Sequence, residues 1–121
     1  MFTFRVDDLS KMNEKLRAFA EFLRSENIED NDVFFCRLVS CELISNVIRH
    51  GGEAAEFNGG IGDGKVVITV VASSFDGVSL TSELPDVLAE NGRGMYIVRN
   101  ICSGEVEKLN GGVRVTYKLN K

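Results

Sequence analysis

The stretch that decides the fold is DVFFCRLVSCELISNVIRHGG, residues 32–52. Apolar side chains recur in it every three or four residues, which predicts a helix with one face in a hydrophobic core. The members of this stripe are Val33, Cys36, Val39, Leu43 and Val47, widened by Phe35, Leu38, Ile44 and Ile48. Asp32 is expected to cap the helix N-terminus, and the glycines at 51 and 52 are expected to end it.

A row of polar side chains runs along the same predicted helix. Glu42, Asn46 and His50 are spaced four residues apart, so a carboxylate, an amide and an imidazole lie on one side of it. Polar groups beside a core are costly to bury unless they find partners. The row therefore either hydrogen-bonds to neighbouring loops or faces a ligand.

The composition and charge of the chain limit the classes of protein to which it can belong. The chain has 121 residues, 44% hydrophobic and 26% charged, which predicts one globular domain over residues 1–121. The formal net charge of −4 disfavours binding to nucleic acid or to an anionic membrane. No apolar run approaches the roughly 20 residues of a membrane span, and no secretory signal is visible at the N-terminus.

The three cysteines, Cys36, Cys41 and Cys102, lie in apolar helical patterns. An odd number of cysteines in such positions indicates reduced thiols in a cytoplasmic protein. They are not spaced as paired metal ligands, so a structural zinc site is not expected.

The order of predicted elements indicates an α+β fold. Strands are expected at residues 2–6, 53–57, 65–72, 105–110 and 113–119, and helices at 11–26, 32–50 and 95–103. A turn with four glycines is expected at 58–64, and a long loop containing the only proline at 73–91. Because these elements do not alternate as β-α-β units, they predict a two-layer sandwich. Its helices would cover one face of a mostly antiparallel sheet.

A second polar cluster precedes the third predicted helix. Gly92, Arg93 and Gly94 come directly before its apolar residues. Glycines at a helix N-terminus let the backbone approach an anion, and the helix dipole favours phosphate there. An amide oxygen suits magnesium, and a carboxylate one turn earlier can polarise a hydroxyl. The two clusters together predict binding of a nucleoside triphosphate and phosphoryl transfer.

Both clusters resemble motifs of the GHKL ATPase superfamily, which includes histidine kinases, gyrase, Hsp90 and MutL. Residues 42–50, ELISNVIRH, resemble its N-box, and residues 92–98, GRGMYIV, resemble its second glycine box. Residues 111–116, GGVRVT, resemble the "GT" strand near the end of that domain. The resemblance covers residues 2–119 and implies the Bergerat (GHKL ATPase) fold, with three helices on one sheet face.

The resemblance also implies roles on the central helix. Glu42 would be the catalytic base or would orient the attacking group. Asn46 would hold magnesium, and His50 would lie near the phosphates or the lid.

Further roles follow for the rest of the chain. Gly92 and Gly94 would line the phosphate site, Arg93 would contact a phosphate, and Thr116 would match the threonine of the GT strand. The loop at 73–91 would be the ATP lid.

One departure from the family pattern concerns the base of the nucleotide. The family places an Asp-x-Gly-x-Gly box after the strand that corresponds to residues 65–71, and its aspartate recognises adenine. Here Ala72 or Ser73 occupies that place, and a hydroxyl lacks the charge-assisted strength of a carboxylate. The substitution implies weaker ATP binding, a different nucleotide, or a binding protein that keeps the fold without catalysis.

The small size and final hairpin are most similar to the anti-sigma-factor serine/threonine kinases. This resemblance implies ATP and magnesium as cofactors and an anti-anti-sigma (STAS-type) protein or a sigma factor as partner. It also implies a homodimer. The alternative is a catalytically inactive regulator that binds the same partners without phosphoryl transfer.

Overall fold

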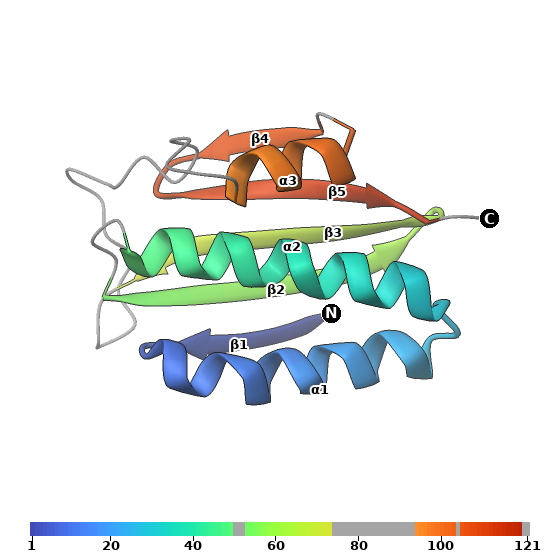
Figure 1. Ribbon diagram of the computed structural model, residues 1–121, viewed down its shortest axis with the longest axis horizontal. Coiled ribbons are helices and arrows are strands. Elements are labelled where there is room, and N and C mark those ends of the chain that lie inside the picture. The colour runs from blue at the N-terminus through green and yellow to red at the C-terminus, as the bar shows by residue number, and fades with distance from the viewer. Residues whose placement is uncertain (50–52, 74–93, 104, 120–121) are drawn as a thin grey trace.

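The computed structural model describes residues 1–49, 53–73, 94–103 and 105–119 (Figure 1). Its helices are α1 (Met12–Ser25), α2 (Asp30–Arg49) and α3 (Gly94–Ile101), and a short 3-10 helix, η1 (Leu9–Lys11), precedes α1. Its strands are β1 (Phe2–Val6), β2 (Ala54–Gly62), β3 (Lys65–Ser73), β4 (Val106–Leu109) and β5 (Gly112–Lys118). Within these residues the strands form one antiparallel sheet in the order β1-β2-β3-β5-β4.

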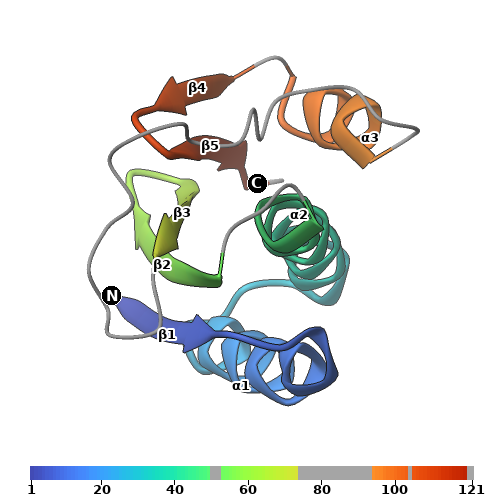
Figure 2. The same ribbon diagram turned by 90° about the vertical axis from the view of Figure 1, so that its left-hand side faces the viewer.

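The described helices all lie on one face of the sheet, with α2 between α1 and α3 (Figure 2). Alternation along β3 shows which face they cover, because Val66, Ile68 and Val70 are fully buried whereas Val67 and Thr69 are only half-buried. The predicted two-layer α+β sandwich is therefore confirmed. No helix in the described part of the chain is long and apolar enough to cross a bilayer.

Strand β2 differs from the sequence-based expectation. Residues 58–62 were expected in a glycine-rich turn, but they continue the strand, and the turn contains only Asp63 and Gly64. The reason lies in the packing of α1, whose Phe19 ring lies against the strand. A Cβ at Gly59 would come within 2.6 Å of Phe19 Cε1, so glycine is required here for close approach rather than for a turn.

The N-terminus of α2 also differs from expectation. The predicted cap at Asp32 is wrong: the helix begins at Asp30, and the N–H of Val33 donates to the carbonyl of Glu29 at 2.9 Å. Asp32 is 2% exposed, and its Oδ1 accepts a hydrogen bond of 2.5 Å from the Tyr117 hydroxyl. The carboxylate therefore ties α2 to β5 instead of capping its own helix.

Three acidic groups around this contact are hard to ionise. Burial raises the pKa of Cys102 to about 11, with Glu105 adding to the shift. Burial also raises the pKa of the Cys36 thiol, aided by the charge of Asp32. For Tyr117, burial and the hydrogen bond to Asp32 raise the pKa of the phenol. All three cysteines are free thiols, as the sequence predicted.

These shifts predict that the fold loses stability in alkali. In the unfolded chain the thiols ionise near their ordinary pKa of 9.0, whereas the folded chain keeps their protons. The unfolded state then binds fewer protons, so the free energy of unfolding falls as pH rises above about 9, by about 1.4 kcal/mol per pH unit for each retained proton. For Cys102 the loss continues until pH passes its folded pKa of about 11.

Urea unfolding measured at intervals from about pH 8 to about pH 11 tests this expectation. The variant Cys102→Ala should give a shallower decline than the wild type, because one of the retained protons is gone. A free energy of unfolding that stays constant over this range would contradict the expectation.

Candidate functional site

Glu42 and Gly94 are adjacent in space although they belong to different helices. Glu42 lies on α2 and is half-buried, and Gly94 is the first residue of α3. A Cβ added to Gly94 would clash with Oε2 of the Glu42 carboxylate. The carboxylate therefore lies directly against the N-terminus of α3, and the absence of a side chain at position 94 makes room for it.

The electrostatics of this position favour negative charge. The first N–H groups of a helix have no partner within the helix, and the dipole adds partial positive charge at that end. Among the described residues, none forms a hydrogen bond or an ion pair with the Glu42 carboxylate. A half-buried carboxylate without such a partner can accept a proton or a hydrogen bond from a ligand.

Asn46 lies one turn after Glu42 on α2 and is more enclosed. Its side chain is only 4% exposed. Spacing of four residues puts it on the same side of the helix as Glu42. No group of three or more His, Cys, Asp and Glu side chains in the described ranges could hold a metal ion. A magnesium ion at Asn46 would thus need oxygen ligands from a nucleotide and from water.

Ser73 ends β3 and is fully buried. Its Oγ makes no hydrogen bond with any residue that the structure describes. A buried hydroxyl without a partner costs about 1–3 kcal/mol. Ser73 alternates along β3 with Ala72 and Val70, which face the helices, so it is on the sheet face away from Glu42 and Asn46. The described fold supplies no partner for its hydroxyl, which lies at the strand end where the family resemblance places base recognition.

Thr116 does not join Glu42, Gly94 and Asn46 either. Thr116 alternates along β5 with the buried Val115 and Tyr117, so it lies on the sheet face away from the helices. Its backbone N–H donates to the carbonyl of Glu105 at 3.1 Å. The structure thus places Thr116 and Glu42 on opposite sides of the sheet.

Several expectations fall outside the described residues. His50, Gly92 and Arg93 belong to this group, as does the predicted lid after Ser73. Their roles stay predictions.

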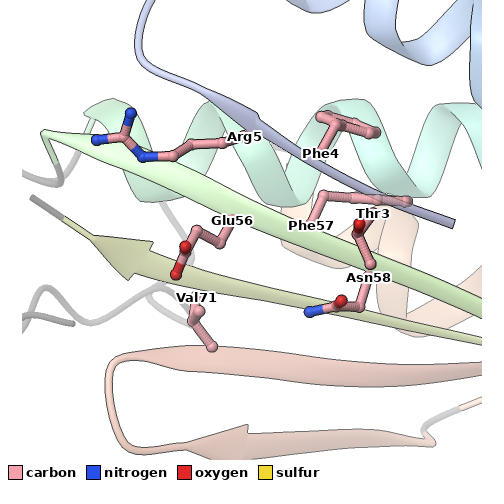
Figure 3. Close-up of a pocket in the computed structure, with 7 residues that line it drawn as sticks. All are labelled: Thr3, Phe4, Arg5, Glu56, Phe57, Asn58 and Val71. Atoms are coloured by element: carbon pink, nitrogen blue, oxygen red, sulfur yellow. The ribbon is translucent and has the colours of Figure 1, made fainter. Parts of the chain in front are cut away.

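A hollow of about 370 Å³ lies on the sheet face away from the helices (Figure 3). Thr3, Arg5, Glu56, Asn58 and Val71 contribute to its lining, with Arg5 directly opposite Glu56 in the strand register. Sequence reasoning missed this hollow. The alternation of polar residues along the first two strands is the signal that could have indicated a solvent-facing surface.

Comparison with known proteins finds similarity at the level of structure. Neither a scan of protein-family models nor a search of curated proteins finds a match. Among solved structures, the catalytic domain of the histidine kinase ThkA, in a nucleotide-free form, aligns over 100% of this chain and 98% of its own. The identity is 22% and the TM-score is 0.49.

The fold itself is consistent with the GHKL ATPase fold that the sequence resemblance implies. It has a five-stranded antiparallel sheet with α1, α2 and α3 on one face in the described residues.

Proposed function

We propose that this chain is an anti-sigma regulatory factor of the GHKL type that binds ATP with magnesium. Its activity would be phosphoryl transfer to a serine or threonine of a STAS-type anti-anti-sigma protein. The observation that supports nucleotide binding best is the contact between the Glu42 carboxylate and Gly94. It brings together two motifs that are far apart in the sequence, at a helix N-terminus suited to phosphate. The kinase class and the partners rest on the sequence resemblance.

The described residues fit this chemistry in part. Gly94 leaves the space that the Glu42 carboxylate occupies, and this carboxylate has no hydrogen-bond or ion-pair partner among the residues that the structure describes. When bound, magnesium ATP would supply an activated γ-phosphoryl group. Glu42 would accept the proton of the attacking hydroxyl, and the amide oxygen of Asn46 would be a magnesium ligand.

A second candidate function is a regulator that binds its partner without phosphoryl transfer. Ser73 favours it, because a serine at the end of β3 cannot give the charge-assisted contact that the family's aspartate gives to adenine. Losing such a contact lowers affinity by about ten- to a hundredfold. In this alternative the chain would still bind a sigma factor or an anti-anti-sigma protein in the cytoplasm, as a homodimer.

Thermal unfolding with and without magnesium ATP tests nucleotide binding. A ligand at about 100 times its dissociation constant adds about 2.7 kcal/mol to the free energy of unfolding, which raises Tm by roughly 10 °C for a chain of this size. Calorimetry with ATP, ADP and GTP, with and without magnesium, would then identify the nucleotide. If no nucleotide changes the Tm, the kinase function is excluded, and the regulator that binds its partner without phosphoryl transfer is the remaining candidate.

A further inference from the structure

Helices α1 and α2 lie side by side in the helix layer (Figure 2). Residues of both helices line a groove on its surface. Its volume is about 200 Å³, and its lining consists of Asn13, Leu16, Phe34, Arg37, Leu38 and Cys41. It lies on the α1 side of α2, whereas Glu42 faces α3. The groove is therefore separate from the candidate nucleotide site.

Exposed aromatic surface borders the groove. Phe34, which lines the groove, is 61% exposed. Its neighbour Phe35 does not line the groove, and its ring lies near that of Tyr117 on β5, with centroids 6.4 Å apart. Phe34 adds apolar surface to the half-buried Leu38, which lies one turn further along α2.

The size of the groove indicates what it can accept. Small-molecule pockets usually have volumes of about 300–1,000 Å³, so 200 Å³ is small for a nucleotide or a cofactor. The space suits one or two apolar side chains. A groove between two neighbouring helices receives such side chains best from a third helix, which presents them at spacings of three and four.

The charged residues around the groove indicate the charge that a partner would carry. Arg37 lines the groove, and Arg17 lies one turn after Asn13 on the same side of α1. Neither arginine forms an ion pair or a hydrogen bond with any residue that the structure describes. The chain as a whole carries a net charge of −4, so this basic border is a local feature. It complements carboxylates on a partner.

We propose that the groove between α1 and α2 is a docking site for an amphipathic helix of another protein. The partner helix would place apolar side chains over Leu16, Phe34 and Leu38, and acidic side chains beside Arg17 and Arg37. This docking does not depend on nucleotide binding.

Selection from a display library tests the proposal. The library presents one helix with randomised surface positions and is selected against the full chain. We expect the enriched helices to carry apolar residues at spacings of three and four and an excess of aspartate and glutamate. Phe34→Ala and Arg37→Glu should each weaken binding by about tenfold or more, as at interface hot spots.

Matched controls distinguish a specific contact from a general loss of surface. Tyr96 on α3 is 60% exposed, almost the same as Phe34, so Tyr96→Ala should leave affinity unchanged. Lys15→Glu, on an exposed position of α1 that does not line the groove, controls for net charge. Replacing the acidic residues of a selected helix with glutamine should weaken binding to the wild type but not to Arg37→Glu. Glu42→Gln should not affect binding, which separates this test from that of the proposed function.

Several results would overturn the proposal. These are a selection that yields no helix, binders enriched in basic residues, and binders that tolerate Phe34→Ala. Sedimentation supplies the last test, because a dimer that dissociates in Phe34→Ala would identify a second copy of this chain as the occupant.

Discussion

Replacing Glu42 with glutamine is expected to slow phosphoryl transfer by about 10²–10⁴-fold, the usual contribution of a positioned general base. Glutamine has nearly the same shape, so it can keep the contact with Gly94 at the start of α3. It cannot accept a proton from the attacking hydroxyl. Nucleotide affinity should therefore change little, and single-turnover transfer measured beside calorimetric binding would show the two effects separately.

The matched control for this variant is Glu56→Gln. Glu56 is also half-buried, but it lies on the sheet face away from the helices. Its replacement should leave transfer unchanged. If Glu42→Gln transfers phosphate at the wild-type rate, the role assigned to Glu42 is wrong. If the wild type binds nucleotide but transfers nothing, the non-catalytic regulator is the better account.

Local patterns in the sequence predicted most of the fold. The first helix was expected at residues 11–26 and is observed at Met12–Ser25, and the first strand is observed at Phe2–Val6, as predicted. Asp8 caps η1, because its Oδ1 accepts from the N–H of Ser10 at 2.9 Å. These features depend on residues close together in the chain, so periodicity and capping rules find them.

The two wrong predictions have non-local causes. Asp32 has the chemistry of a cap, but the partner seen in the structure, Tyr117, is 85 residues away. Gly59 has the chemistry of a turn, but the ring of Phe19 requires it in a strand. In both cases tertiary packing overrides a local preference, and a single sequence does not show which distant residue will be the neighbour.

For the candidate site as well, local spacing was predictable from the sequence, whereas contacts between distant residues were not. Helical spacing put Glu42 and Asn46 on one side of a helix, and their chemistry suggested a shared site with the glycine cluster at residues 92–94. Spacing could not show that Gly94 lies directly against Glu42. The match of Thr116 to the GT strand took no account of strand alternation, which puts this side chain on the other sheet face. The exposed position of Phe34 was not predicted, because this residue lies outside the apolar stripe that marks the buried side of α2.

The largest loss of stability is expected for Gly112→Ala, at the start of β5. A Cβ at this position would clash with the carbonyl oxygen of Val70 and would lie 2.8 Å from Cα of Val71. Both are backbone atoms of β3, which pairs with β5 at this register, so relief requires separating the two strands. Such overpacking costs about 3 kcal/mol and lowers Tm by roughly 10 °C.

Gly62→Ala is the matched control, since a Cβ at that position meets no atom within 4 Å. Its effect should stay within about 0.5 kcal/mol, and equal urea midpoints for the two variants would show that the β3–β5 contact is looser than described.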